Sequence, residues 1–143
     1  MQRDEQKKLT ETANRLRRYR EKAASADVLR AKLSALQETA SACRRSSPGA
    51  AIRAQLRAAY RRTEVQLRLQ QVETRQIECA LERLTPEERL ILTDMLIRPV
   101  PMAADQLCEK LNIETATVYR RRRAALRKMA GLLGEKGSRN GTA

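Results

Sequence analysis

The feature that most constrains this chain is where its helix-breaking residues stand. Residues 1–47 contain no glycine or proline, and neither do residues 50–85, whereas a Ser-, Pro- and Gly-containing segment lies between them. Proline removes a backbone donor and glycine weakens a helix, so long stretches without either can stay helical throughout. The sequence therefore predicts two long helices, at 3–44 and about 51–84, joined by a turn at about 45–50.

Apolar residues in both stretches recur at alternating spacings of three and four, which is the heptad pattern of helices that pack side by side. In the first helix the pattern is carried by Leu29, Leu33, Leu36, Ala40 and Cys43. Leu9, Leu16 and Ala23 precede it in a different frame, so the stripe shifts near residues 24–28. In the second helix the pattern runs through Leu56, Tyr60, Thr63, Leu67, Gln70, Thr74, Ile77, Leu81 and Leu84.

Two amphipathic helices joined by a short turn predict an antiparallel hairpin over residues 1–84. A lone pair of helices buries little surface, and Thr63, Gln70 and Thr74 place polar groups in its seam. We therefore expect a second copy of the chain to complete the core, which makes the hairpin an oligomerisation element. A hairpin completed by another protein, or one that stands alone, is the alternative.

The composition excludes several classes of protein. The chain has no histidine, phenylalanine or tryptophan, and only three tyrosines. Without histidine most zinc sites and every histidine-dependent triad are excluded, and scarce aromatic residues argue against an RNA-binding platform that stacks bases. Its abundant Ala, Leu, Arg, Glu and Gln favour an all-α fold. No phosphate-binding loop or nucleophile–base pair is visible, so we expect no enzymatic activity, no cofactor and no small-molecule substrate.

Three cysteines, Cys43, Cys79 and Cys108, lie far apart without paired spacing. This pattern predicts reduced side chains in a cytoplasmic protein rather than a disulfide or metal framework. No stretch approaches the roughly 18 apolar residues of a membrane-spanning helix, and the N-terminus lacks the apolar region of a signal peptide. We therefore expect neither a membrane partner nor secretion.

The charge balance favours a polyanion as partner. Lysine and arginine number 30 against 17 acidic residues, for a formal net charge of +13. The excess is spread along the chain, but residues 115–128 contain six basic residues and no acid, namely Arg120, Arg121, Arg122, Arg123, Arg127 and Lys128. A local cluster of this kind is a better guide than total charge, and it favours nucleic acid.

The segment after the second long helix begins a separate domain. Thr85 suits the N-cap, Pro86 the first turn, and Glu88 completes a capping box with Thr85. The apolar face of this helix consists of Leu90, Ile91, Met95 and Leu96. Pro99 and Pro101 then end the helix, because neither has an amide hydrogen to donate.

Two further helices follow, with a sharp turn between them. The first is predicted at about 103–111, and the second runs from about Glu114 or Thr115 to about Met129. Asn112 lies in the turn, where the chain needs a left-handed residue and Asn is the best choice after Gly. The apolar positions that lock the two helices together are Leu107, Leu111, Ile113 and Val118. Glycines and polar residues near the end predict a flexible tail at 134–143, so the domain spans 85–133.

One face of the last helix is fixed against the core by Val118, Ala125 and Met129, which lie at i, i+7 and i+11. The residues on the opposite face, in the first turns of the helix, have the position of base-reading residues in a recognition helix. The basic residues further along the helix are expected to contact phosphates. The residues predicted to contact DNA are Thr115, Ala116, Thr117, Tyr119, Arg120, Arg121, Arg123, Arg127 and Lys128.

The stretches "LTPEERLILTDML" and "AADQLCEKLNIETATVYRRRRAALRKMAGLL" resemble the region-four helix-turn-helix of bacterial sigma factors. Among proteins with such a unit, the chain is most similar to phage late transcription activators of the RinA/ArpU type. Those proteins also place a helical hairpin ahead of the DNA-binding unit. The chain departs from the family at Arg122, where many sigma-type helices carry a hydrophobic residue. No segment resembles the sigma region that melts promoters, so the resemblance implies an accessory activator rather than a complete sigma factor.

The sequence therefore predicts an all-α protein with a long antiparallel hairpin followed by a sigma region-four-like helix-turn-helix. Its predicted function is sequence-specific binding of double-stranded DNA in transcription, as a phage or mobile-element activator with RNA polymerase as a candidate second partner. One alternative is a phage DNA-packaging protein similar to a small terminase subunit, in which the DNA-binding unit usually precedes the long helices. The other is a coiled-coil adaptor whose arginines form only a solvated surface.

Overall fold

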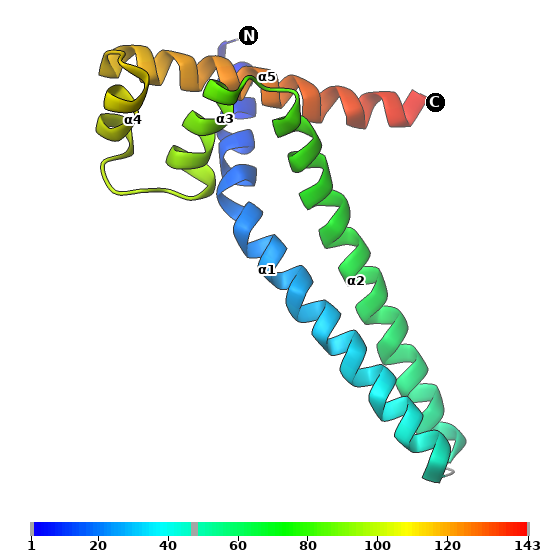
Figure 1. Cartoon of the computed structure of the whole chain (residues 1–143). Helices are drawn as coiled ribbons and strands as arrows, with labels where there is room; N and C mark the ends of the chain where they lie inside the picture. The colour runs from blue at the N-terminus through cyan, green and yellow to red at the C-terminus, as the bar shows by residue number, and fades with distance from the viewer. Residues whose placement is uncertain (1, 47–48, 143) are drawn as a thin grey trace. The chain divides into compact units, whose positions relative to one another are not determined.

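The computed structural model describes the backbone of residues 2–46 and 49–142, with side chains as far as residue 134. Within these residues every regular element is helical, which confirms the all-α prediction (Figure 1). In chain order the elements are α1 (Gln2–Ser46), α2 (Ala50–Glu82), α3 (Pro86–Leu92), the π-helical turn η1 (Thr93–Ile97), α4 (Ala103–Leu111) and α5 (Thr115–Thr142).

The two long helices begin and end within two residues of their predicted bounds. Of the turn between them, residues 47 and 48 lie outside the described residues. The two threonines of the seam satisfy their hydroxyls locally, because the Thr63 hydroxyl donates to the Ala59 carbonyl at 2.9 Å and the Thr74 hydroxyl to the Gln70 carbonyl at 3.1 Å. Gln70 Oε1 is buried without a hydrogen-bond partner in the described part of the chain, so the seam does carry one costly polar atom.

The chain divides into two compact units, and the division differs from the predicted one. Unit 1 comprises residues 1–20 and 75–143, and unit 2 comprises residues 21–74. The boundary thus runs through α1 and α2 rather than between residues 84 and 85. It falls just before the segment 24–28, where the apolar stripe of the first helix changes frame.

The core of unit 1 explains why the first helical turns belong to it. Leu9, Ala13 and Leu16 of α1 are buried in the same apolar cluster as residues from the end of α2, from α3 and η1, and from α5. The other buried members are Ile77, Ala80, Leu84, Leu92, Leu96, Ile97, Ala125, Leu126 and Met129. Residues 85–133 therefore share one core with the start of α1.

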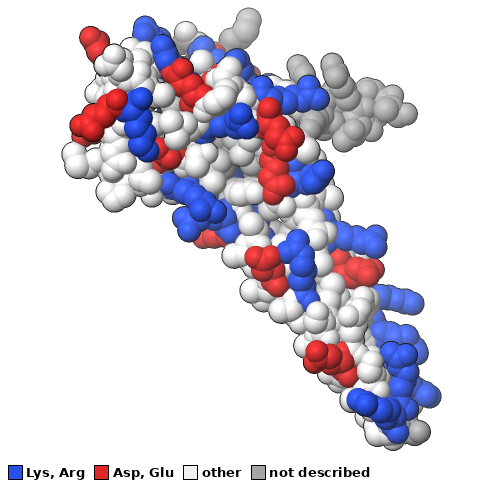
Figure 2. Space-filling model, in the orientation of Figure 1, with Lys and Arg blue, Asp and Glu red and all other residues white. Residues whose placement is uncertain are grey.

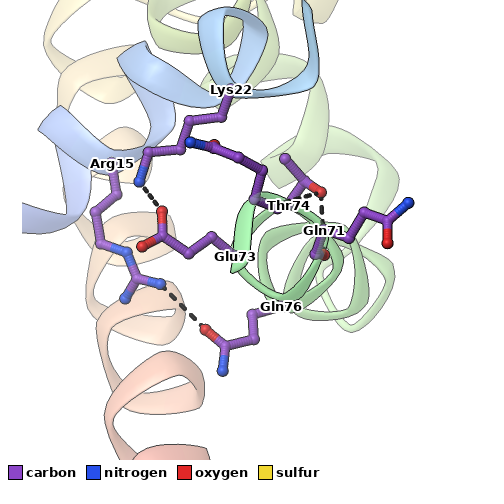
Figure 3. Close-up of polar contacts among 7 residues, drawn as sticks. Arg15, Lys22, Gln71, Glu73, Thr74 and Gln76 are labelled. Carbon is purple, nitrogen blue, oxygen red and sulfur yellow. Dashed lines mark hydrogen bonds and ion pairs between the residues drawn. The ribbon is translucent and has the colours of Figure 1, made fainter. Parts of the chain in front are cut away.

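Unit 2 is an antiparallel helical hairpin formed by the remaining parts of α1 and α2 (Figure 1). Lys22 and Glu73 form an ion pair between the two helices (Figure 3). Gln37 Nε2 donates to the Tyr60 hydroxyl at 3.0 Å. Pairing of early residues of one helix with late residues of the other is the antiparallel arrangement that the sequence predicted.

α5 continues past its predicted end. Its backbone is helical to Thr142, whereas the sequence predicted a flexible tail from residue 134; the side chains beyond that residue lie outside the described ones. No proline follows Pro101, and a glycine inside a helix costs only about 1 kcal/mol relative to alanine, so nothing in this segment forces the helix to end. Within the described residues, none of the helices is both long and apolar enough to cross a membrane.

Candidate nucleic-acid interface

α3 begins with both hydrogen bonds of the predicted capping box. The Glu88 amide donates to Thr85 Oγ1 at 3.2 Å, and the Thr85 amide donates to Glu88 Oε1 at 2.9 Å. Partial burial opposes ionisation of Glu88, but the Thr85 amide and the Lys128 ammonium outweigh it and hold the pKa of the Glu88 carboxyl below its ordinary value. Glu88 therefore caps α3 and also links it to α5.

The connection from α3 to α4 contains an unusual backbone position. η1 closes with the Arg98 amide donating to the Thr93 carbonyl at 2.8 Å, and Pro99 follows. Met102, the residue before α4, has a φ of 53° and a side chain that is 72% exposed. A left-handed conformation is uncommon for a residue other than glycine. No pattern in the sequence predicts it at this position.

The turn between α4 and α5 has the predicted conformation. Asn112 adopts φ 55° and ψ 50°, which confirms the left-handed residue at this position. The Ile113 amide donates to the Cys108 carbonyl at 3.2 Å, and Cys108 Sγ lies 3.4 Å from Thr115 Oγ1. α5 starts at Thr115, so the two helices are separated by three residues.

A small apolar cluster holds α3, α4 and α5 together. Its centre consists of Ile91, Leu107 and Val118, each 0% exposed. The predicted buried face of α5 is confirmed, because Ala125 and Met129 are also 0% exposed. These contacts fix the rotation of α5 about its own axis, which decides the residues that the helix presents to solvent.

Eight of the nine residues predicted to contact DNA are exposed, and the ninth, Thr117, is half-buried. At 3.6 residues per turn the exposed side of α5 divides into a centre and two flanks. Ala116, Arg120, Arg123 and Arg127 lie along the centre. Arg120 Nη2 also donates to Thr117 Oγ1 at 3.3 Å, within the same helix.

The flank beside α3 contains two ion pairs. Arg121 is paired with Glu87, and Lys128 Nζ lies 2.9 Å from Glu88 Oε2. Both acidic residues stand in the first turn of α3, so that turn supplies carboxylates to two cations of α5. The sequence predicted Arg121 and Lys128 to contact DNA, but no pattern in it indicated these acidic partners.

The side of α5 toward α1 has a groove, and from that side α1 also reaches Arg127 at the centre of the exposed face. Glu5 of α1 is paired with Arg127. A groove of about 310 Å³ lies between the two helices, lined by Gln6, Leu9, Thr10, Ala13, Arg17, Tyr119, Arg122, Arg123 and Leu126. Arg122 is half-buried in this groove. The aliphatic part of an arginine can cover apolar surface while its guanidinium group stays in water. Arg122 can therefore occupy a position at which many sigma-type helices carry a hydrophobic residue.

Three arginines of the cluster retain uncompensated charge. Within the described residues, Arg120, Arg122 and Arg123 form no ion pair with an acidic side chain. Their guanidinium groups can donate paired hydrogen bonds to phosphate oxygens or to the acceptor edge of guanine. This arrangement therefore suits an anionic ligand that approaches the first three turns of α5.

No cluster of three or more Cys, Asp or Glu side chains able to hold a metal ion occurs among the described residues. Comparison of the chain with protein-family models, with curated proteins and with solved structures gives no match.

Proposed function

We propose that the protein is a sequence-specific transcriptional regulator that binds double-stranded DNA, with α4 and α5 as its helix-turn-helix. α5 is the recognition helix and enters the major groove with its first turns. The resemblance to sigma region four and to RinA/ArpU-type activators supports the more specific role of a cytoplasmic phage or mobile-element accessory activator that acts with RNA polymerase.

The observation that carries the proposal is the contrast between the two faces of α5. On one face Val118, Ala125 and Met129 are fully buried, so the helix is rigidly held. On the other face Arg120 and Arg123 are exposed and lack an acidic partner within the described chain. A recognition helix requires this combination, because base readout needs donors held in a fixed register.

The ion pairs of α5 refine the proposal. Phosphates that approach Arg121, Arg127 or Lys128 compete with Glu87, Glu5 or Glu88 for the same cation. These residues therefore attract a random duplex less strongly than their charges alone suggest. Discrimination between sequences then depends mainly on the residues at the centre of the face, above all Arg120 and Arg123.

The test is selection of binding sites from a random duplex library, followed by footprinting of the recovered sequence in the DNA around the protein's own locus. We expect a defined site, bound with an affinity that falls as salt rises. The variant Arg120→Ala/Arg123→Ala should lose the selected site, whereas the matched Arg18→Ala/Arg20→Ala variant, which removes two exposed arginines of α1, should keep it. If the native protein binds no duplex in a salt-dependent way, the proposed function is wrong.

A further inference from the structure

The end of the hairpin in unit 2 carries a second concentration of arginine. Residues 39–63 contain six arginines, no lysine and no acidic residue. The arginines are Arg44, Arg45, Arg53, Arg57, Arg61 and Arg62. Figure 2 shows basic side chains gathered at this end of α1 and α2. None of the six is ion-paired within the part of the chain that the structure describes.

These arginines surround an apolar groove of about 410 Å³ between the two helices. Its floor is formed by Leu36, Ala40 and Cys43 of α1 and by Leu56 and Tyr60 of α2. The charged residues among its lining are Arg44, Arg53, Arg57 and Arg61. The groove thus combines an apolar floor with a cationic rim.

The floor is an unfinished helix–helix seam. In residues 27–62, apart from the undescribed 47 and 48, no side chain is buried, although the heptad stripe continues there. Nearer unit 1 the same hairpin does bury its seam, with Thr63 2% and Leu67 8% exposed. The leucines of the hairpin end therefore remain accessible to water unless another element covers them, and covering them is favourable.

We propose that this groove binds an acidic amphipathic helix of another protein. A helix with an apolar stripe covers the floor, and carboxylates beside that stripe reach the guanidinium groups of the rim. A second copy of the same groove does not fit, because its lining contains four arginines and no acidic residue, so a two-fold contact would bring like charges together. Duplex DNA would satisfy the arginines but leave Leu36 and Leu56 uncovered. The inference is independent of the proposed DNA binding, which uses residues of unit 1.

The direct test measures fluorescence anisotropy of labelled helical peptides with the full-length protein. The probe is a synthetic helix of about three heptads, roughly 30 Å long, with leucine at its a and d positions and glutamate at its e and g positions. One control peptide has serine in place of leucine, and another has lysine in place of glutamate. We expect the probe to bind at least about tenfold more tightly than either control, because the floor and the rim both contribute.

Two measurements locate the binding. Arg57→Glu/Arg61→Glu should weaken binding of the probe at least about tenfold, whereas Arg18→Glu/Arg20→Glu, with the same change in charge, should weaken it far less. In a Cys79→Ala/Cys108→Ala background, Cys43 is the only thiol and lines the groove. Its alkylation by iodoacetamide should slow as the probe is added.

Each of four results would overturn the proposal. If the serine control binds as tightly as the probe, the interaction depends on charge alone. If the probe leaves the rate of Cys43 alkylation unchanged, the peptide binds outside the groove. Protection of Cys43 by random duplex DNA instead of the probe makes this end of the hairpin a nucleic-acid surface. If Cys43 becomes protected from alkylation when the protein concentration is raised without any peptide, a second copy of the chain covers the groove.

Discussion

Glu5, in the first turn of α1, is ion-paired with Arg127 of α5, which lies 122 residues further along the chain. Both side chains are about half exposed, at 44% and 53%. An exposed pair of this kind contributes only about 0–1 kcal/mol to stability. Its larger effect is on charge, because Glu5 neutralises a cation that the sequence assigned to DNA.

Replacing Glu5 by glutamine should therefore strengthen binding to random duplex DNA. Arg127 would then be available to a phosphate, so the slope of log K against log salt should steepen by up to about 0.9. Glu11→Gln is the matched control, since it removes another exposed carboxylate of α1 that has no ion pair within the described residues. If both variants gain the same affinity, the effect is one of net charge and the Glu5–Arg127 pair does not restrain Arg127.

The capping box predicts a dependence of stability on pH. The folded protein holds the pKa of Glu88 below its ordinary value of 4.5, so the carboxylate stabilises the fold above that pH. This stabilisation is lost as the pH falls through the lowered pKa of the folded state. In urea titrations between about pH 5 and about pH 3, the free energy of unfolding should fall less steeply for Glu88→Gln than for the native protein.

The control for this titration is Glu82→Gln, an exposed residue at the end of α2 with no ion pair in the described part of the chain. Its pH dependence should match that of the native protein. An identical slope for Glu88→Gln and the native protein would show that the hydrogen bond from the Thr85 amide does not favour the ionised carboxyl.

The sequence predicted the local features of the fold and missed those that join distant segments. The Thr85–Glu88 capping box and the left-handed Asn112 follow from residues within a few positions of each other, and both are confirmed. Heptad spacing identified Leu9 and Leu16 as an apolar face but did not indicate what covers it. That face packs into the core of unit 1, and periodicity contains no information about such a partner.

In the candidate interface, too, local features could be predicted and contacts between distant segments could not. The buried face of α5 could be predicted because Val118, Ala125 and Met129 repeat at helical spacing. The ion pairs of Arg121 and Arg127 could not be predicted from the sequence, because their partners Glu87 and Glu5 belong to other helices. A basic cluster in a sequence therefore indicates how many cations are present, but not how many remain uncompensated in the folded protein.

Self-association of the chain remains a prediction, and the structure offers a surface on which to test it. Val65, Leu69 and Val72 are 56%, 63% and 53% exposed, and their spacing of four and three places them on one face of α2. We expect the full-length protein to sediment as a dimer at about 20 µM. Leu69→Lys should convert it to a monomer, because a charge on this face would be buried in the contact.

The matched control is Val28→Lys, which adds the same charge at a residue of α1 that is 68% exposed. It should leave the sedimentation coefficient unchanged. A native protein that is monomeric under these conditions would exclude the homo-oligomer, and a dimer that survives Leu69→Lys would exclude this face as the contact.

The last prediction separates base readout from general attraction along α5. Arg120 lies at the centre of the exposed face and has no acidic partner in the described chain, whereas Arg127 and Lys128 lie two turns further on and are paired with Glu5 and Glu88. A contact to a base edge discriminates by about 1–3 kcal/mol, and a contact to phosphate does not discriminate. Arg120→Ala should therefore reduce the ratio of affinities for the selected site and for random DNA by about 10- to 100-fold.

Changing Arg127 and Lys128 together to alanine should weaken binding to both DNAs about equally. Removing one cation that neutralises a phosphate flattens the plot of log K against log salt by about 0.9, but the change should be smaller here because both cations already have acidic partners. Circular dichroism must show that both variants remain folded. An unchanged ratio for Arg120→Ala would mean that another face of α5, or another helix, reads the bases.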